Sequence, residues 1–342
     1  MNEVHQKIID AVIRKAERVC PDSLLLIGVY GSAATGDLHP KSDLDLLILI
    51  GDEQGWQLAD GFVLADTEIG YDIYCTNWDM LEGDAKCSHA HLSKLLDCKN
   101  VYVKEPSVAV RLEELQAKAR ELLASDQRNE KAYAAFATAK AMYADCFLAD
   151  SHSGVRISSG AAIHYLLDAV MLYHGQYFRM GVKRIFAEVS ALGLPFDMEA
   201  MVMEVIRGTT AEEIRTALTK LMHCVRDHLN APSSKEQPSA ANLKGTYEEM
   251  FSNWRNKMGE AAQREDLFSS FMNMVSFQFM LDEIAASVDI PDQDGMAEFD
   301  PRDLRKNAEV FDCILAQYRE EYRKAGLEPK VLPNVDAFVE QY

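Results

Sequence analysis

The sequence predicts an α+β protein in which a small mixed-sheet domain, residues 1–106, precedes a larger all-helical domain, residues 107–290, and a C-terminal helix and tail, residues 291–342. Short apolar runs bounded by Gly, Ser or Asp, typical of strands, are confined to the first hundred residues. After Pro106 the chain turns to long segments rich in Ala, Leu, Met and Tyr with apolar residues three and four positions apart, as in helices. The length of 342 residues also exceeds one average domain of about 100–200 residues.

The first hundred residues alternate between helical and strand-like patterns. Apolar residues from Val4 to Val19 recur at helical spacing, and Cys20-Pro21-Asp22 ends that helix. The apolar run 24–30 predicts a buried strand that stops at Gly31-Ser32, and residues 33–42 are typical of a loop with a helical turn. The remaining expected elements are strands at 43–50, 69–76 and 101–104 and a helix at 88–98.

The rest of the chain predicts helices joined by short loops. A connector rich in Pro and Ser over residues 231–245 interrupts them. Beyond residue 326 we expect irregular structure. The expected helices span 108–124, 130–150, 159–180, 182–192, 198–207, 211–229, 247–258, 265–286 and 300–323.

The charge balance narrows the classes of partner. There are 35 Lys and Arg against 54 Asp and Glu, a formal net charge of -19. Such a chain repels phosphate backbones, which weighs against a broad nucleic-acid interface. The excess of acids suits a small cationic ligand, and metal ions where carboxylates cluster.

Neither a membrane span nor a disulfide framework is predicted. No apolar run approaches the roughly 20 residues that a membrane helix needs, and the mixed charges of residues 1–18 do not resemble a secretory signal. The seven cysteines are scattered, odd in number and without a Cys-x-x-Cys pair, so they indicate reduced thiols. We therefore expect a cytoplasmic protein.

The most informative stretch is Gly31-Ser32 followed, after ten residues, by Asp43-Leu44-Asp45-Leu46. Residues two apart on a strand project from the same face, so Asp43 and Asp45 present paired carboxylates while the leucines face a core. Such oxygen ligands suit Mg²⁺, and a shared pair can hold two ions about 3.5–4 Å apart. At the end of the preceding strand, the backbone amides and the Ser32 hydroxyl form a cradle for phosphates. Gly31 lets the backbone approach a ligand without a Cβ in the way.

Carboxylates and a phosphate cradle on one short segment indicate phosphoryl-group chemistry on a nucleoside triphosphate that enters as its Mg²⁺ complex. A third carboxylate usually completes such a site. Asp72 is the best candidate because it is an acid in an otherwise apolar strand. It would bind metal or accept the proton of an acceptor hydroxyl as general base.

These residues resemble the motif of the nucleotidyltransferase superfamily that includes DNA polymerase β. Residues 31–36 and 42–46 look like the antibiotic-modifying branch, with its kanamycin, streptomycin and lincosamide nucleotidyltransferases and the minimal nucleotidyltransferases. The resemblance implies two Mg²⁺ ions bound by Asp43 and Asp45, triphosphate contacts from Gly31 and Ser32, and transfer of a nucleoside monophosphate with release of pyrophosphate. Many relatives carry a basic residue where this chain has Ala34, which leaves Lys41, beside Ser42, as the nearest substitute on the nucleotide side.

The second domain resembles, more weakly, the helical domain that walls the cleft in these small-molecule transferases. The resemblance rests on the segment 164–170, on Tyr177-Phe178-Arg179 and on Lys183-Arg184, and it extends to about residue 230. It makes Asp168, an acid inside an apolar helix, a candidate contact for a cationic acceptor.

Each of these residues also has a structural interpretation. Asp168 could be a surface acid or a member of an ion pair, and Lys183 and Arg184 could be solvated helix charges. The two histidines of His89-Ala90-His91, without a further partner, are typical of a surface rather than of a metal site. The Met and aromatic stretch 268–280 is typical of a core.

The sequence thus predicts a Mg²⁺-dependent enzyme that moves a nucleoside monophosphate from ATP or another triphosphate to a hydroxyl of an aminoglycoside- or lincosamide-like molecule. One alternative is a protein-modifying transferase that adds the nucleotide to a Tyr or Ser of a partner. Another is a non-catalytic nucleotide-binding module, and the absence of a basic residue at Ala34 supports it. A polymerase or CCA-adding activity would need a nucleic-acid groove that the charge balance disfavours.

Overall fold

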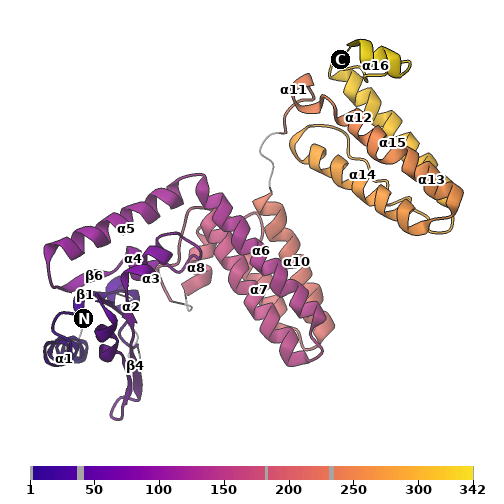
Figure 1. Cartoon of the computed structure of the whole chain (residues 1–342). Coiled ribbons are helices and arrows are strands. Elements are labelled where there is room, and N and C mark those ends of the chain that lie inside the picture. Colours follow the sequence, from indigo (N-terminus) through magenta and orange to yellow (C-terminus); the bar gives the residue numbers. More distant parts are fainter. Residues whose placement is uncertain (1–2, 37–41, 182–183, 231–234, 342) are drawn as a thin grey trace. The chain divides into compact units, whose positions relative to one another are not determined.

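The computed structural model describes residues 3–36, 42–181, 184–230 and 235–341. The chain divides into two compact units, Met1–Ala231 and Pro232–Tyr342. Figure 1 shows the mixed α and β elements of the first unit and the helices of the second. The division falls at the start of the connector expected over residues 231–245.

A four-stranded mixed sheet lies in the first unit, in the order β5-β2-β1-β6. Its strands are β1 (Leu24–Val29), β2 (Leu46–Ile50), β5 (Cys75–Thr76) and β6 (Lys99–Val103). Strand β1 pairs antiparallel with both β2 and β6, whereas β2 pairs parallel with β5. The prediction of a small mixed sheet followed by a mostly helical chain is therefore confirmed.

Both faces of this sheet are covered, and β2 shows this most clearly because all five of its residues are buried. Ile48 and Ile50 belong to a core that they share with helix α1 (Glu3–Val19). Leu47 and Leu49 belong to a second core, built mainly by the helices that follow the sheet. The alternation of side chains along β2 thus assigns one set to each face.

A separate two-stranded sheet is formed by β3 (Asp60–Leu64) and β4 (Ile69–Ile73), with Asp72 opposite Gly61. The single strand expected over residues 69–76 is therefore wrong. Its first part pairs in this hairpin, and only Cys75 and Thr76 join the main sheet as β5. The single strand expected over residues 43–50 is likewise shorter, since β2 begins at Leu46.

Helices make up most of the rest of the first unit. Helices α6 (Gln127–Leu148), α7 (His152–Tyr173) and α10 (Ala211–Leu229) pack against one another, and their apolar side chains continue the core on the second face of the sheet. Helix α7 ends at Tyr173, before the expected residue 180, because Gly175 adopts a left-handed conformation with a φ of +64°. This position also requires glycine because a Cβ there would overlap the Leu123 carbonyl. The helices are α2 (Gly31–Thr35), η1 (Glu53–Leu58), α3 (Trp78–Asp84), α4 (Ser93–Leu96), α5 (Pro106–Ala124), α6 (Gln127–Leu148), α7 (His152–Tyr173), α8 (Ile185–Ser190), α9 (Met198–Arg207) and α10 (Ala211–Leu229).

Among the described residues, α7 is the one helix whose length and composition would allow it to cross a membrane. Its most apolar window is 56% buried inside the unit. Core helices of soluble proteins pass the same test, and α7 packs in this way against α6 and α10. All seven cysteines are free thiols, as their spacing predicts.

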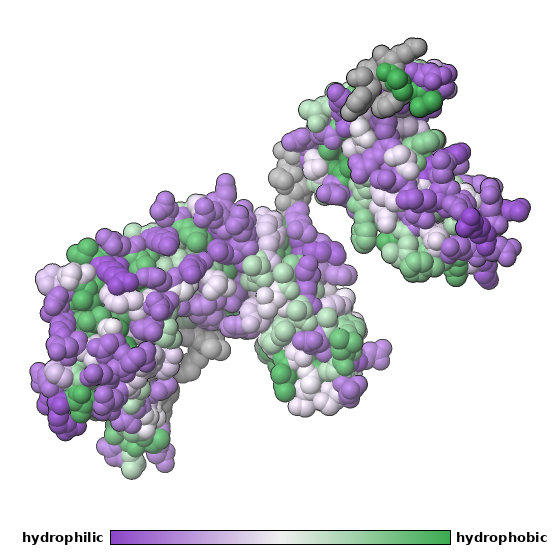
Figure 2. Space-filling model, in the orientation of Figure 1, coloured by the Kyte–Doolittle hydropathy of each residue, from purple (hydrophilic) through white to green (hydrophobic). Residues whose placement is uncertain are grey.

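The second unit is helical and has its own core, to which Phe277, Phe311 and Tyr318 contribute. This core joins residues on both sides of position 290, so the compact units differ from the domain boundaries expected at 106 and 290. The expected core stretch 268–280 is divided, because Met274 and Phe277 are buried while Phe268 and Phe279 are exposed. Elsewhere, hydrophilic residues are interspersed with small apolar groups over the visible surface (Figure 2). The helices are α11 (Ala240–Leu243), α12 (Thr246–Met250), η3 (Phe251–Arg255), α13 (Asn256–Arg264), α14 (Leu267–Ser287), α15 (Leu304–Lys324) and α16 (Val335–Gln341), the last within the tail expected to be irregular.

Candidate functional site

Asp43 and Asp45 lie immediately before β2, at the edge of the main sheet. The Tyr30 amide donates to the Asp45 carbonyl at 3.1 Å, which continues the pairing of β1 and β2 beyond the strand ends. Leu44 is buried in the core shared with α1. Because side chains alternate along extended backbone, the two acids turn to the other face of the sheet, away from α1 and toward the helices that follow the sheet.

Gly31 and Asp45 fit together directly. Gly31 adopts a φ of +61°, and a Cβ at this position would overlap the Asp45 carboxylate. The next residue, Ser32, donates its backbone N–H to the same carboxylate. We expected the missing Cβ to give room to a ligand, but in this structure the second acid of the motif takes up that space.

Negative charge is concentrated around these residues. Burial, and then repulsion from Asp43, raises the pKa of Asp45, which the Ser32 amide partly offsets. The pKa of Tyr30 is raised to about 12, chiefly by burial. Four negatively charged carboxylates add to this shift, and their contributions decrease in the order Asp45, Asp43, Asp84, Asp72. A half-buried acid beside a like charge, with oxygen ligands on the same side of the chain, fits a divalent cation, whose charge would relieve the repulsion.

A cavity of about 620 Å³ opens next to the two acids. Four segments of the first unit line it, so residues far apart in sequence meet there. Of the residues predicted for the site, it brings together Gly31, Ser32, Ser42, Asp43 and Asp45, while Lys41 lies outside the described residues. The other lining residues are Tyr30, Asp84, His89, His91, Ser93, Lys94, Phe178, Arg179, Met180, Gly181, Arg184 and Ile185.

Asp72 does not line this cavity. It is exposed on β4, and among the four carboxylates it has the smallest effect on the pKa of Tyr30. Asp84, at the end of α3, does line the cavity and was not predicted. Burial would raise the pKa of Asp84, but its contacts with His89 at 3.5 Å and Lys94 at 3.0 Å outweigh this and lower it.

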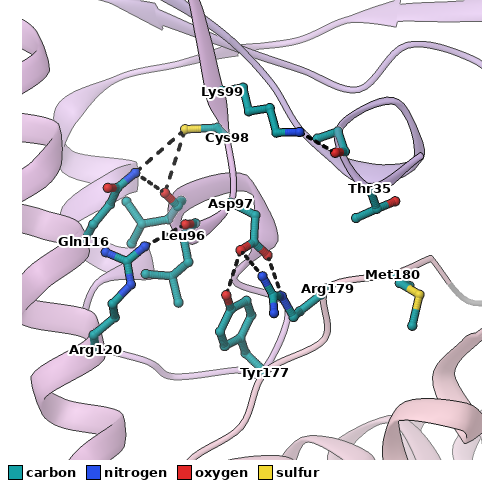
Figure 3. A network of polar contacts seen from close by, with 12 residues as sticks. Thr35, Leu96, Asp97, Cys98, Lys99, Gln116, Arg120, Tyr177, Arg179 and Met180 are labelled. Atoms are coloured by element: carbon teal, nitrogen blue, oxygen red, sulfur yellow. Dashed lines mark hydrogen bonds and ion pairs between the residues drawn. The ribbon is translucent and has the colours of Figure 1, made fainter. Parts of the chain in front are cut away.

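Two basic groups to which the sequence assigned no role lie in this part of the fold, one at the cavity and one at helix α2. Arg179 lines the cavity, and Asp97 holds its guanidinium at 3.0 Å and also accepts a hydrogen bond from the Tyr177 hydroxyl at 2.8 Å (Figure 3). Lys99 at the start of β6 reaches the turn that carries Thr35, where its Nζ donates to the Ala34 carbonyl at 2.7 Å (Figure 3). A cation therefore stands beside the position where the motif lacks a basic residue. No local pattern marks it, because 65 residues separate Lys99 from Ala34.

Asp168 is a buried acid of α7, with 1% of its side chain exposed. It does not line the cavity, but His91, which does, lies 3.8 Å from its Oδ1. The Ala90 amide donates to Oδ1 at 2.9 Å, and His164 lies 3.7 Å from Oδ2. Burial lowers the pKa of His91, which the Asp168 charge opposes. The interpretation of Asp168 as a surface acid is therefore wrong.

Of three comparisons with known proteins, the one with family models gives a match. The family model described as a nucleotidyltransferase domain matches residues 7–84, under a quarter of the chain. A comparison with curated proteins finds no significant match. Among solved structures, a nucleotidyltransferase-like protein from Exiguobacterium sibiricum aligns over 81% of this chain and 92% of that chain, with 12% identity and a TM-score of 0.39, which is too low to carry an argument.

The family match runs from α1 to α3 and includes both parts of the motif, Gly31-Ser32 and Asp43-x-Asp45. Residues 7–84 are therefore a nucleotidyltransferase domain, and the chain is an enzyme of the transferase class.

Proposed function

We propose that this protein transfers a nucleoside monophosphate from a Mg²⁺-bound nucleoside triphosphate, with ATP as the first donor to test, to a hydroxyl of a small molecule, releasing pyrophosphate. One observation carries the proposal. The two parts of the nucleotidyltransferase motif, Gly31-Ser32 and Asp43 with Asp45, lie together at one cavity in the domain that the family model matches.

Asp43 and Asp45 are the proposed ligands of Mg²⁺. Their fit to a cation is supported by the raised pKa of Asp45, which reflects burial and then repulsion by Asp43. Bound Mg²⁺ supplies charge stabilisation at the attacking and leaving oxygens of phosphoryl transfer. Asp72 remains our proposal for a third carboxylate, and its exposed place on β4 requires that the bound nucleotide reach the hairpin side of the site.

Hydrogen-bond donors and positive groups at the site are suited to the triphosphate. The hydroxyl of Ser32 and the guanidinium of Arg179 belong to residues that line the cavity, and Asp97 holds the guanidinium in place. Lys99, beside the Ala34 carbonyl, is the proposed replacement for the basic residue that the motif lacks. Charge-assisted contacts of this kind orient phosphates and favour the developing charge of the transition state.

In the proposed reaction the acceptor oxygen forms a bond to the α-phosphorus while the bond from that phosphorus to the bridging oxygen of pyrophosphate breaks. The hydroxyl proton must leave, and a carboxylate near the acceptor takes it. Asp72 is the candidate base. The acids lining the cavity would also attract a cationic acceptor, in keeping with an aminoglycoside- or lincosamide-like molecule.

A screen of acceptors tests the proposal. Pyrophosphate release is measured with ATP and Mg²⁺ across a panel of aminoglycosides, lincosamides and neutral polyols, for the wild type and for Asp43→Asn. Acceptor-dependent release that Asp43→Asn abolishes supports the proposal. Asp66→Asn, at an exposed acid in the β3–β4 turn, is the matched control and should retain activity. Nucleotide incorporation into proteins of a lysate, with none into small molecules, would contradict a small-molecule acceptor.

A further inference from the structure

A second group of potential ligands, outside the Asp-x-Asp motif, lies at the wall of the same cavity. We infer that His91, His164 and Asp168 bind one divalent transition-metal ion of the Zn²⁺ type. Their ligand atoms all lie within 4.8 Å of one another. The inference does not depend on the proposed function, because it concerns residues outside that motif and a different class of metal.

The carboxylate at the centre of this group is buried and only partly satisfied. Asp168 Oδ1 accepts the Ala90 amide at 2.9 Å. Oδ2 is buried and has no hydrogen-bond partner among the described residues. Its nearest ionisable neighbour is His164 Nε2 at 3.7 Å, beyond hydrogen-bond distance. A buried carboxylate oxygen without a partner is costly, and a cation would offset that cost.

The two histidines face this carboxylate from different parts of the fold. Their rings stack almost in parallel, 5.1 Å apart and 3° between planes, and each has its Nε2 within 4 Å of Asp168. His164 lies one turn before Asp168 on α7, and His91 follows Ala90 in the segment between α3 and α4. Half-exposed imidazoles can rotate, whereas the carboxylate is fixed by burial.

The segment that carries His91 is held firmly. Ala90 is fully buried, and its amide donates to Asp168 while its carbonyl accepts the Phe178 amide at 2.8 Å. The Phe178 ring also packs on the His91 ring, with centroids 4.9 Å apart. Two of the three ligands are therefore positioned by hydrogen bonds and packing, independently of any metal.

The donor set selects the class of ion. Two imidazole nitrogens with one carboxylate suit Zn²⁺ and similar first-row ions, whereas Mg²⁺ prefers oxygen ligands alone. Donor atoms around a tetrahedral Zn²⁺ lie roughly 3.4 Å apart. The Nε2 atoms of His91 and His164 lie 3.8 and 3.7 Å from the Asp168 oxygens, close to that separation, and we expect a small rotation of the rings on binding of the ion.

Three protein ligands leave a coordination position open, as in catalytic rather than structural zinc sites. His91 lines the cavity that contains Asp43 and Asp45, and the side chains of His91 and His164 are 42% and 52% exposed. The open position is therefore accessible from the side of the cavity, and water would fill it in the absence of another ligand.

Titration of the full chain with Co²⁺ and Zn²⁺ tests the inference. Co²⁺ bound by two histidines and a carboxylate gives intense visible absorption that hydrated Co²⁺ lacks, and Zn²⁺ should displace it with one ion per chain. His164→Ala should weaken the affinity by more than about 100-fold, since removal of a ligand costs more than loss of an outer-shell partner. His223→Ala, at an exposed histidine of α10, is the matched control and should bind as the wild type does.

The variants separate the possible outcomes. Asp168→Asn should also lose the ion. If this variant fails to fold, His164→Ala still tests the inference, because His164 is exposed and its replacement should leave the fold intact. Asp45→Asn should keep the Co²⁺ spectrum, so failure of the proposed transfer activity and failure of this site are distinguishable. A wild type that binds Co²⁺ and Zn²⁺ no more tightly than His164→Ala would overturn the inference and leave a histidine–carboxylate ion pair only.

Discussion

The two carboxylate sites at the cavity differ in how the chain builds them. Asp43 and Asp45 are two residues apart in sequence and directly precede β2, and Gly31 packs against Asp45. This site offers oxygen ligands only. Asp168 shares helix α7 with His164, which lies one turn before it, and meets His91 from the distant segment between α3 and α4. Asp168 is also buried, whereas Asp43 is exposed and Asp45 is half-buried. The first site is therefore visible as a motif in the sequence. In the second, only the pair His164 and Asp168 has a local spacing, and His91 joins it through tertiary packing.

The two sites also balance charge differently. Asp45 faces another acid, and burial together with that acid raises its pKa. Asp168 faces an amide and two imidazoles. The first arrangement is costly without a cation, while the second is partly satisfied by the protein itself.

The largest expected effect is on activity at the first site. Asp45→Asn removes a proposed metal ligand and should lower kcat/KM for nucleotidyl transfer by about 10³-fold or more, because metal stabilisation of the transferring phosphoryl group contributes several kcal/mol. The rate of pyrophosphate release measures it. Asp66→Asn controls for loss of a surface charge, and a rate within ten-fold of wild type for Asp45→Asn would remove this residue from the machinery.

At the second site, the clearest expected effect is on stability. Asp168→Ala leaves the buried Ala90 amide without an acceptor, so the free energy of unfolding should fall by about 1–3 kcal/mol. Asp168→Asn keeps an acceptor oxygen and should lose less. Urea denaturation of both variants checks the order, and equal losses would show that the charge, rather than the hydrogen bond, stabilises the segment.

Gly31→Ala tests the contact between the glycine and the second acid of the motif. The positive φ and the overlap with the Asp45 carboxylate should together cost about 1–2 kcal/mol of stability. Gly61→Ala, where a Cβ meets nothing within 4 Å, is the matched control. Thermal unfolding compares them, and equal unfolding temperatures would contradict the close fit of Gly31 and Asp45.

Lys99→Ala should weaken the binding of Mg²⁺-ATP by about five-fold, the size expected for one exposed charge near phosphates. Its amine donates to the carbonyl of Ala34, in the motif segment that is proposed to contact the triphosphate. Lys104→Ala, just beyond the other end of β6, where the amine contacts Asp22, serves as control. If both variants bind equally well, Lys99 does not replace the basic residue that the motif lacks.

The smallest effect concerns pH. Because the folded pKa of Asp45 is raised, ionising this acid costs more in the folded than in the unfolded state. Without divalent cations, the wild type should therefore lose stability relative to Asp45→Asn as pH rises above 3.8, the ordinary value, and through the raised pKa. Unfolding temperatures at stepped pH measure the difference, and a wild type that gains stability relative to Asp45→Asn as pH rises would contradict the assigned repulsion.

Local patterns predicted the elements that depend on local sequence. The apolar spacing from Val4 to Val19 predicted α1, and the run from Leu24 predicted β1, because amphipathic helices and buried strands carry their period in the chain itself. The strand expected over residues 69–76 is instead divided between two sheets, since the pairing of β4 with β3 depends on tertiary structure that the strand's own residues do not reveal.

The candidate site divides in the same way. Gly31, Ser32, Asp43 and Asp45 could be named from their spacing. Spacing did not mark Asp84, Lys99 and Arg179. Asp84 and Arg179 reach the cavity, and Lys99 reaches the Ala34 carbonyl, only through packing of elements distant in sequence. His91 lacked a partner in the sequence, and only the fold brings His164 and Asp168 beside it.

The central claim is that Asp43 and Asp45 hold a metal–nucleotide complex, and calorimetric titration with ATP tests it most directly. We expect the wild type to bind ATP in the presence of Mg²⁺ and to lose most of that affinity with EDTA or with Asp43 and Asp45 both changed to Asn. Failure of the wild type to bind ATP or any other nucleoside triphosphate with Mg²⁺, or equal binding by the double variant, would contradict the claim.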